Sequence, residues 1–169
     1  MKRAIITPAE LGGAALSELK EWLAISTPHE DNILIAMLGA ALDMCESFTG
    51  TMPLSAVCEE VWTATSEWQT LGARPVQAIT GISGIPAEGP QFALPPDAYE
   101  VDLDADGSGR FRVLRQGSAG RVAVHFTAGL APGWGSLPDG LRHGIIRFAG
   151  FQYRDRDTAN AAAPPAAVT

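Results

Sequence analysis

Residues 120–157 decide the fold, because this stretch combines a strand, a turn and a helix: GRVAVHFTAGLAPGWGSLPDGLRHGIIRFAGFQYRDRD. Alternate residues from Val122 to Phe126 are apolar, which is the period of a half-buried strand. After a Gly- and Pro-rich turn, Ser136–Asp139 predicts the first turn of a helix, since proline and a carboxylate suit that position. A stripe at helical spacing then predicts a helix over about 137–156 that lies on a core; it comprises Leu141, Ile145, Phe148 and Ala149.

Two glycines lie inside this predicted helix, Gly140 and Gly144, four residues apart. Each costs about 1 kcal/mol relative to alanine in a helix interior. We therefore expect another element to approach the helix backbone closely at these positions.

Two further helices are predicted upstream, over about 7–25 and 27–49. Each is expected to begin at a Thr-Pro-x-Glu capping box, Thr7–Glu10 and Thr27–Glu30, and Gly50 is expected to end the second helix. Their apolar stripes predict two antiparallel helices joined by a tight connection: Leu11, Ala15, Leu19, Trp22 and Leu23 in the first, and Leu34, Met37, Leu38, Ala41, Leu42, Cys45 and Phe48 in the second.

The region over about 54–128 is predicted to be rich in strands, the first two over 54–68 and 74–82. The Gly- and Pro-rich connection from Ser83 to Pro96 is long enough for a functional loop.

A hairpin is predicted from the alternating segment Ala98–Asp104, a turn, and Arg110–Val113. The expected register places Asp104 opposite Arg110 and Asp102 opposite Arg112, so that opposite charges face each other. The same register places Leu103 beside Phe111 and Val101 beside Val113.

These patterns together predict a single α+β domain over 1–157, long enough to bury a core of its own. It is a small antiparallel bundle of two N-terminal helices and one C-terminal helix, with a β-rich insertion of antiparallel strands. Residues 158–169 are almost entirely Ala and Pro, which predicts a flexible tail that a partner would order.

The composition limits the possible functions. A net charge of −7 disfavours a surface that grips nucleic acid, but it does not exclude a wall past which DNA slides. Apolar runs are too short to predict a membrane span or a signal peptide, so we expect a soluble protein without a membrane partner. Cys45 and Cys58 are expected to be reduced thiols.

Two motifs suggest chemistry, and each has a simpler interpretation. Asp102-x-Asp104-x-Asp106-Gly107 matches the first half of a calcium-binding loop, but Val113 stands where that loop needs glutamate, and a hairpin explains the same residues. Asp139 and His143 are spaced to form an acid–base pair, without a serine or cysteine in a nucleophile setting. We expect no catalytic residue, metal or cofactor; a monomeric ligand- or protein-binding module using the Ser83–Pro96 loop, and an enzyme using Asp139 and His143, remain alternatives.

Four stretches, in their order and spacing, resemble the head-tail connector (adaptor or head-completion) family of tailed bacteriophages and gene transfer agents. They are Phe48-Thr49-Gly50, Arg74–Ile79, Leu94–Val101, and the strand, loop and helix that end at Asp157. The chain departs from the family in its polar Glu59-Glu60 pair and in the length of its Ala/Pro tail.

The resemblance implies a structural protein, not an enzyme, that assembles into a twelve-fold ring at the head-tail junction of a particle put together in the bacterial cytoplasm. Its implied partners are other copies of itself, a portal protein on one side and a stopper or tail-terminator protein on the other. DNA would pass through the channel without sequence-specific binding.

The resemblance also implies that the end of the chain reaches into the portal. The candidate portal-binding residues are Tyr153, Arg154, Arg156, Pro164, Pro165 and Val168. Independently of the family, residue type and loop position suggest three interface candidates, Gln91, Phe92 and an exposed Trp134.

Overall fold

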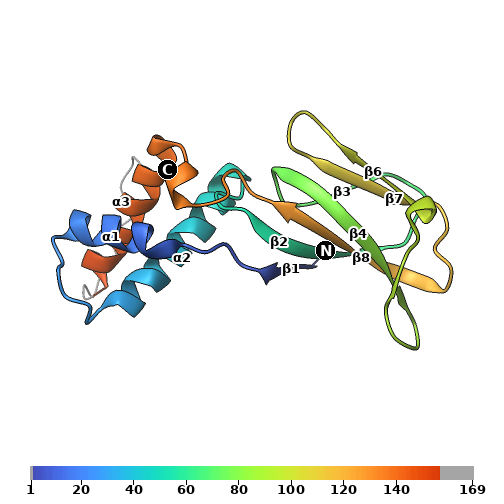
Figure 1. Cartoon of the computed structure of the whole chain (residues 1–169), viewed down its shortest axis with the longest axis horizontal. Helices are drawn as coiled ribbons and strands as arrows, with labels where there is room; N and C mark the ends of the chain where they lie inside the picture. The colour runs from blue at the N-terminus through green and yellow to red at the C-terminus, as the bar shows by residue number, and fades with distance from the viewer. Residues whose placement is uncertain (1, 157–169) are drawn as a thin grey trace. The chain divides into compact units, whose positions relative to one another are not determined.

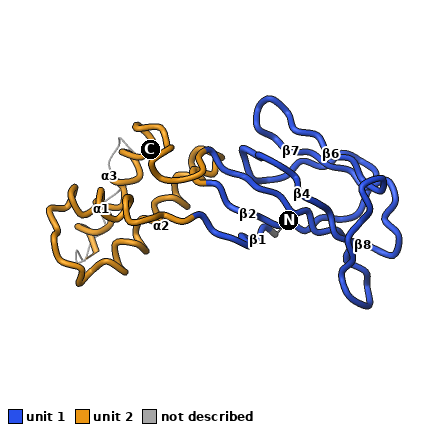
Figure 2. Tube along the Cα trace, in the orientation of Figure 1, with its two compact units in different colours: residues 1–9, 55–130 blue, residues 10–54, 131–169 orange. Residues whose placement is uncertain are grey.

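A computed structural model describes residues 2–156 and confirms the α+β class, with three α-helices and antiparallel sheets (Figure 1). The described chain forms two compact units (Figure 2). Residues 2–9 and 55–130 form the β unit, and residues 10–54 and 131–156 form the helical unit. The expectation of one domain over 1–157 stays a prediction.

The β unit contains two antiparallel sheets, of order β1-β2-β8-β4-β5 and β3-β7-β6. A 3-10 turn at Pro96–Ala98 precedes β6. The strands are β1 (Lys2–Thr7), β2 (Ala56–Thr63), β3 (Gln69–Thr70), β4 (Val76–Pro86), β5 (Phe92–Ala93), β6 (Tyr99–Leu103), β7 (Gly109–Val113) and β8 (Ala119–Ala128).

The core of the β unit lies between the two sheets. In β8, the alternating residues Val122, Val124 and Phe126 are fully buried, as the sequence predicted. Phe111 of β7 is also fully buried, and its ring meets the Trp62 ring edge-on with centroids 6.0 Å apart. The central position of β8 between β2 and β4 explains its apolar sequence, because both of its edges are paired.

A buried carboxylate, Glu60, lies among these apolar side chains and is fully enclosed. It accepts hydrogen bonds from the Trp62 indole at 3.1 Å and from the Gly72 and Ala73 backbone amides at 3.1 to 3.2 Å. The carboxylate therefore ties β2 to the segment after β3, and its burial is compensated by hydrogen bonds.

The first predicted helix begins later than expected. Residues Lys2–Thr7 form β1, which pairs with β2, and α1 spans Gly12–Leu23. The Thr7 capping box is wrong, because Thr7 is paired with Val57 in the sheet and cannot also cap a helix.

The second capping box is wrong as well. Helix α2 spans Asp31–Thr49 and is preceded by Glu30, without a side-chain cap. The Glu30 carboxylate instead binds the end of the third helix. At the other end the prediction is confirmed: Gly50 adopts φ of 65°, and its amide donates to the Glu46 carbonyl at 2.8 Å.

The hairpin of β6 and β7 forms, but its register differs by two residues from the predicted one. Asp102 lies opposite Arg110, and Glu100 lies opposite Arg112. The turn has the predicted length but begins one residue earlier, because Leu103 and Gly109 form the closing pair; a Cβ at Gly109 would lie 2.9 Å from Val76. Opposite charges still face each other because a shift of two residues keeps every side chain on the same face.

The predicted Ser83–Pro96 loop is mostly a second hairpin. Strand β4 continues to Pro86 and β5 pairs back onto it, with Ser83 opposite Ala93. The segment is therefore a short antiparallel extension of the sheet.

The helical unit packs α2 against the third helix, α3 (Asp139–Asp155), and α1 contacts both. A 3-10 turn at Trp134–Ser136 leads into α3. Most of the predicted stripes are confirmed by their burial: Ala15 and Leu19 in α1, Leu34, Leu38 and Ala41 in α2, and Ile145, Phe148 and Ala149 in α3. Trp22 and Phe48 are exceptions, because 43% and 61% of these residues are exposed.

Candidate functional site: apolar surfaces of the helical unit

Helix α2 carries more apolar surface than its neighbours cover. We call one exposed row the outer stripe; its spacing follows one face of the helix. Ile33, Met44 and Phe48 are well exposed, at 44%, 37% and 61%, and Met37 is half-buried. The outer stripe comprises Ile33, Ala36, Met37, Ala40, Met44 and Phe48.

By length and composition alone, α2 is long and apolar enough to cross a membrane, with a mean hydropathy of 1.2. This corrects the expectation that no apolar segment reaches that length. The core helix of a soluble protein meets the same criterion, and the row of Leu34, Leu38 and Ala41 is buried within the helical unit.

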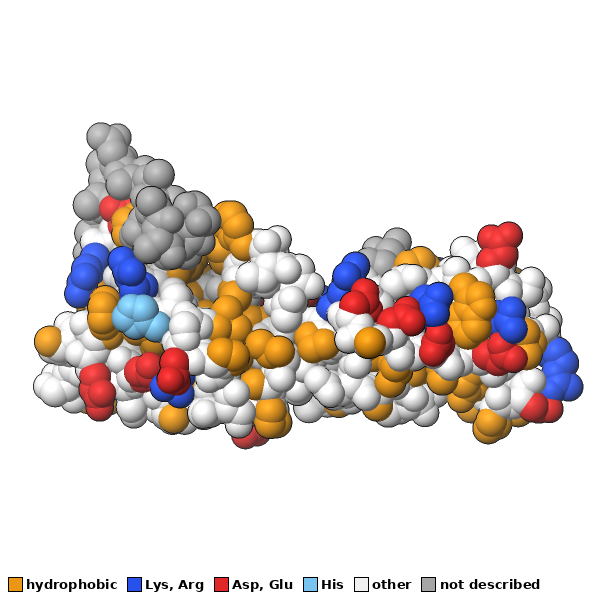
Figure 3. Space-filling model, turned by 90° about the horizontal axis from the view of Figure 1, so that it is seen from above, with side chains coloured by type: hydrophobic (Ala, Val, Ile, Leu, Met, Phe, Trp, Pro, Cys, Tyr) orange, Lys and Arg blue, Asp and Glu red, His pale blue; other side chains and the backbone are white. Residues whose placement is uncertain are grey.

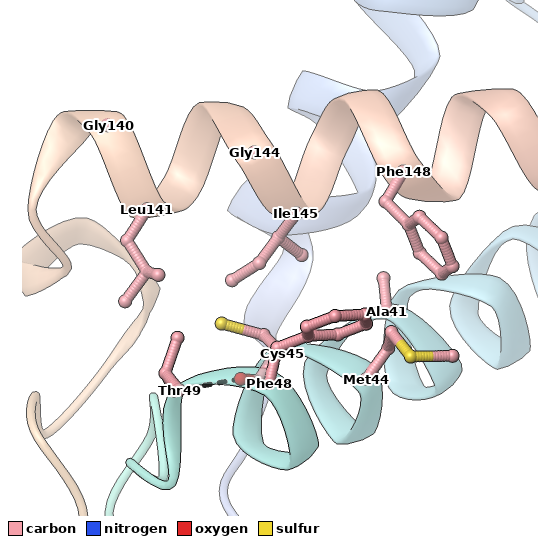
Figure 4. Close-up of a pocket in the computed structure, with 10 residues that line it drawn as sticks. All are labelled: Ala41, Met44, Cys45, Phe48, Thr49, Gly140, Leu141, Gly144, Ile145 and Phe148. Carbon is pink, nitrogen blue, oxygen red and sulfur yellow. Dashed lines mark hydrogen bonds between the residues drawn. The ribbon is translucent and has the colours of Figure 1, made fainter. Parts of the chain in front are cut away.

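An open apolar groove of about 150 Å³ lies between α2 and α3 (Figure 4). Leu141, Ile145 and Phe148 point from α3 toward α2. The lining from α2 is Ala41, Met44, Cys45, Phe48 and Thr49, and the lining from α3 is Gly140, Leu141, Gly144, Ile145 and Phe148.

The glycines of α3 do not all serve the purpose that the sequence suggested. A Cβ added to Gly140 or Gly144 would meet nothing within 4 Å, so the expected close approach at these two positions is wrong. Close approach occurs at Gly150, where a Cβ would lie 2.9 Å from the Trp22 side chain. Gly140 and Gly144 instead leave room along the groove.

Cys45 is the only thiol among the groove residues, and it is half-buried. Burial raises the pKa of the Cys45 thiol above its ordinary value. A raised pKa keeps the sulfur protonated and poorly nucleophilic at neutral pH. The groove is therefore suited to apolar contact rather than to thiol chemistry.

The end of α3 is fixed to the start of α2 through Glu30. The Tyr153 hydroxyl donates to one carboxylate oxygen, and Arg156 donates to the other at 2.7 Å. The Arg156 guanidinium also lies 4.1 Å from the centre of the Tyr153 ring. Hydrogen bonds from Tyr153 and Arg156 lower the pKa of Glu30, and the bond to Glu30 raises the pKa of Tyr153.

Two of the predicted portal-binding residues, Tyr153 and Arg156, thus belong to one cluster, while Arg154 is exposed. Pro164, Pro165 and Val168 lie outside the described residues.

The structure corrects Trp134 as an exposed interface residue. Only 4% of Trp134 is exposed, and its indole donates to the Glu18 carboxylate at 2.8 Å. Trp134 therefore supports the helical unit from inside. Of the other two interface candidates, Gln91 is exposed at the tip of the hairpin and Phe92 is half-buried in β5.

The residues proposed for chemistry are engaged elsewhere. Asp139 pairs with Arg142 at 3.1 Å, and the His143 ring meets the Trp22 ring edge-on, so the acid–base pair of the alternative enzyme interpretation is not formed. Arg110 contacts both Asp102 and Asp104. Within residues 2–156, no three His, Cys, Asp or Glu side chains gather as a group that could hold a metal ion.

A chain of polar side chains that the sequence did not suggest crosses three strands of the five-stranded sheet. The His125 ring lies 3.3 Å from Glu59 through Nδ1 and 3.1 Å from the Ser83 hydroxyl through Nε2. The order resembles a Ser-His-acid triad, but Ser83 lies inside β4 and is paired on both sides, not on a sharp exposed turn. We interpret the chain as a cross-strand network, which only the register of the strands could have revealed.

Hydrophobic side chains thus lie on the surface among charged ones, as one face of the molecule shows (Figure 3). The described helical unit offers two adjoining apolar features, the outer stripe and the groove, and Met44 and Phe48 belong to both. This arrangement can bind apolar side chains of a partner.

No family model matches the sequence, and a search of curated proteins finds no match either. Solved structures do match. One chain from "Neck of empty GTA particle computed with C6 symmetry" is 26% identical, with a TM-score of 0.75 over 98% of this chain and 90% of that chain.

A chain from "Virion of native gene transfer agent (GTA) particle" has a TM-score of 0.74 at 26% identity, over 97% of this chain and 90% of the other. A chain from "Neck of native GTA particle computed with C12 symmetry" has a TM-score of 0.72 at the same 26% identity, over 97% and 89%. The likeness therefore includes the helices and the sheets.

Proposed function

We propose that this chain, which belongs to the head-tail connector family of gene transfer agents, forms an oligomeric ring that joins the portal to the stopper or tail. The observation that carries the proposal is the match over 97 to 98% of the chain to components of the neck and virion of such particles. The chain is accordingly a structural component of the particle at the head-tail junction.

A ring is supported by the symmetry of the similar assemblies, whose necks are described with C6 and C12 symmetry. Copies repeated around an axis contact each other through two different faces, and such contacts close into a ring when the rotation closes. The exposed apolar surface on α2 supplies one surface that could be covered by such a contact.

Portal binding is supported by the end of α3. The cluster of Glu30, Tyr153 and Arg156 holds this end in place, and residues 157–169 follow directly after it. In this proposal the fixed end positions the Ala- and Pro-rich segment to enter the portal, and Arg154 contributes an exposed positive charge beside it.

A DNA channel is supported by the net charge of −7. Acidic walls repel the phosphate backbone, so DNA can pass a ring of such subunits without being held.

The proposal is tested by measuring the mass of the protein alone and after mixing with the portal of the same particle, followed by electron microscopy. We expect a ring, or a collar on the portal. A monomer that does not bind the portal would contradict the proposal and favour a monomeric binding module.

A deletion of residues 158–169 tests the portal contact separately. We expect portal binding to be lost while the helical content stays unchanged. Full binding by the truncated chain would contradict the proposed role of the segment.

A further inference from the structure

We infer that the outer stripe of α2 is the surface through which one copy contacts the next, and that it is covered by a face of the neighbouring copy that carries Trp22, His143 and Arg147. We call this second surface the basic face. The inference rests on the proposed function, because it assigns both sides of the contact in the proposed ring.

The outer stripe has the size and chemistry of a contact surface. From Ile33 to Phe48 it runs for about 22 Å along the helix. Residues 32–42 contain no charged side chain, although Ile33 in this segment is 44% exposed. Continuous exposed apolar surface of this kind marks an interaction site in a soluble protein.

The basic face lies away from the groove side chains of α3 that point toward α2. His143 follows the groove residue Leu141 by two positions, which turns it by roughly 200° around the helix, and Arg147 lies one turn after His143, at the edge next to the groove glycines. Trp22 lies on the same side, because it contacts both His143 and the backbone at Gly150. One copy can therefore use the outer stripe toward one neighbour and the basic face toward the other.

The two surfaces are complementary in charge and in residue type. Asp43 is exposed on α2 and lies one helical turn from Ala40 and Ser47, at the border of the outer stripe. Arg147 on the basic face supplies the opposite charge. Trp22 is 43% exposed, and Trp and Arg are the residue types most enriched at interface hot spots.

A second copy is a better occupant than a lipid bilayer. Leu34, Leu38 and Ala41 of α2 are buried and the helix packs against α1 and α3, so lipid could not surround it. The matching necks are described with C6 and C12 symmetry, and copies arranged around an axis can contact each other through two different faces.

The contact is tested with two charge-introducing variants. Met44→Glu places a carboxylate in the outer stripe, and Arg147→Glu reverses the charge of the basic face. The matched control is Ile35→Glu, because Ile35 is 44% exposed on the same helix but lies about 180° around it from Met44. Circular dichroism verifies the fold, and Met44→Gln replaces Met44→Glu if that variant does not fold.

The readout is the mass of each protein under the conditions, alone or on the portal, in which the unmodified chain forms a ring. We expect Met44→Glu and Arg147→Glu each to be monomeric and Ile35→Glu to form rings. An equal mixture of the two monomeric variants should yield a heterodimer, since each supplies the intact surface that the other lacks.

Rings formed by Met44→Glu or by Arg147→Glu would overturn the inference and leave the proposed function intact. Two monomeric variants that do not associate when mixed would also overturn it, because the outer stripe and the basic face would then not bind each other. An unmodified chain that forms no ring even with the portal would contradict the proposed function itself.

Discussion

The two units differ in how their buried and exposed apolar groups are arranged. In the β unit, two sheets enclose Phe111 and Phe126, and even the buried Glu60 has three donors around it. The exposed apolar residues of β1 and β6, such as Ile5 and Val101, lie on strands at a sheet edge. In the helical unit, α2 has one covered row and one uncovered row along its whole length. The β unit thus pairs its buried polar group within the chain, although it also exposes scattered apolar residues such as Val57 and Trp68. The helical unit instead exposes a row of apolar residues along one helix.

The largest expected effect separates the two rows of α2. Leu38→Ala should lower the free energy of unfolding by about 3 kcal/mol, because Leu38 is fully buried and its loss leaves a cavity. Met44→Ala, one and a half turns away on the outer stripe, should change it by less than about 0.5 kcal/mol in the monomer. Urea denaturation of both variants measures the difference. Equal losses would mean that the outer stripe is already packed within the chain.

The next prediction concerns the polar group in the β unit. Glu60→Gln should destabilise the protein by roughly 2 kcal/mol, because one acceptor oxygen is replaced by an amide donor that faces the Gly72 and Ala73 donors. Glu59→Gln on the adjacent residue, which contacts His125 at 3.3 Å on the partly exposed face, should cost less than about 1 kcal/mol. Thermal unfolding compares them. A loss that is no larger at Glu60 would contradict its role in closing the β unit.

A smaller effect is expected from the glycines of α3. Gly150→Ala should destabilise by about 1 kcal/mol, because its Cβ would collide with Trp22. Gly144→Ala should stabilise by about 0.5 to 1 kcal/mol, since alanine favours the helix and the groove has space for a methyl group. Calorimetry measures both changes in stability. A loss for Gly150→Ala and a gain for Gly144→Ala would confirm that packing requires only Gly150. Destabilisation at Gly144 would mean that the groove is closed in solution.

Structural features that follow from the spacing of residues within one helix or strand were predicted from the sequence. Features that depend on a partner distant in the chain were missed. The helical rows of α2 and α3, the alternation in β8 and the turn at Gly50 follow from local spacing and were confirmed. Thr7 matched a helix cap equally well, but strand β2, some 50 residues further along, takes this segment into the sheet.

The same limit explains the errors at the candidate sites. Trp134 is buried where its indole donates to Glu18 in α1, which is distant in sequence. The space at Gly140 and Gly144 depends on how α2 packs against α3. Neither can be read from residues near in sequence. The resemblance to the connector family rested on the order of several stretches along the chain, and the similar solved structures confirm it.

The smallest expected effect tests whether the Glu30 cluster fixes the end of α3 by charge. Bonds from Tyr153 and Arg156 lower the pKa of Glu30 below its ordinary value of 4.5, so the folded state favours the carboxylate. This stabilisation is fully present above pH 4.5 and is lost as the pH falls through the lowered pKa.

Glu30→Gln should therefore be less stable than the unmodified chain at pH 6, and the difference should shrink toward pH 3. In Tyr153→Phe the stability should depend less on pH between pH 6 and pH 3, because this variant loses the hydrogen bond that contributes most to lowering the pKa of Glu30. If the difference in stability between Glu30→Gln and the unmodified chain is the same at pH 6 and at pH 3, the cluster contributes no charge-dependent stability. The end of α3 would then be held by packing alone.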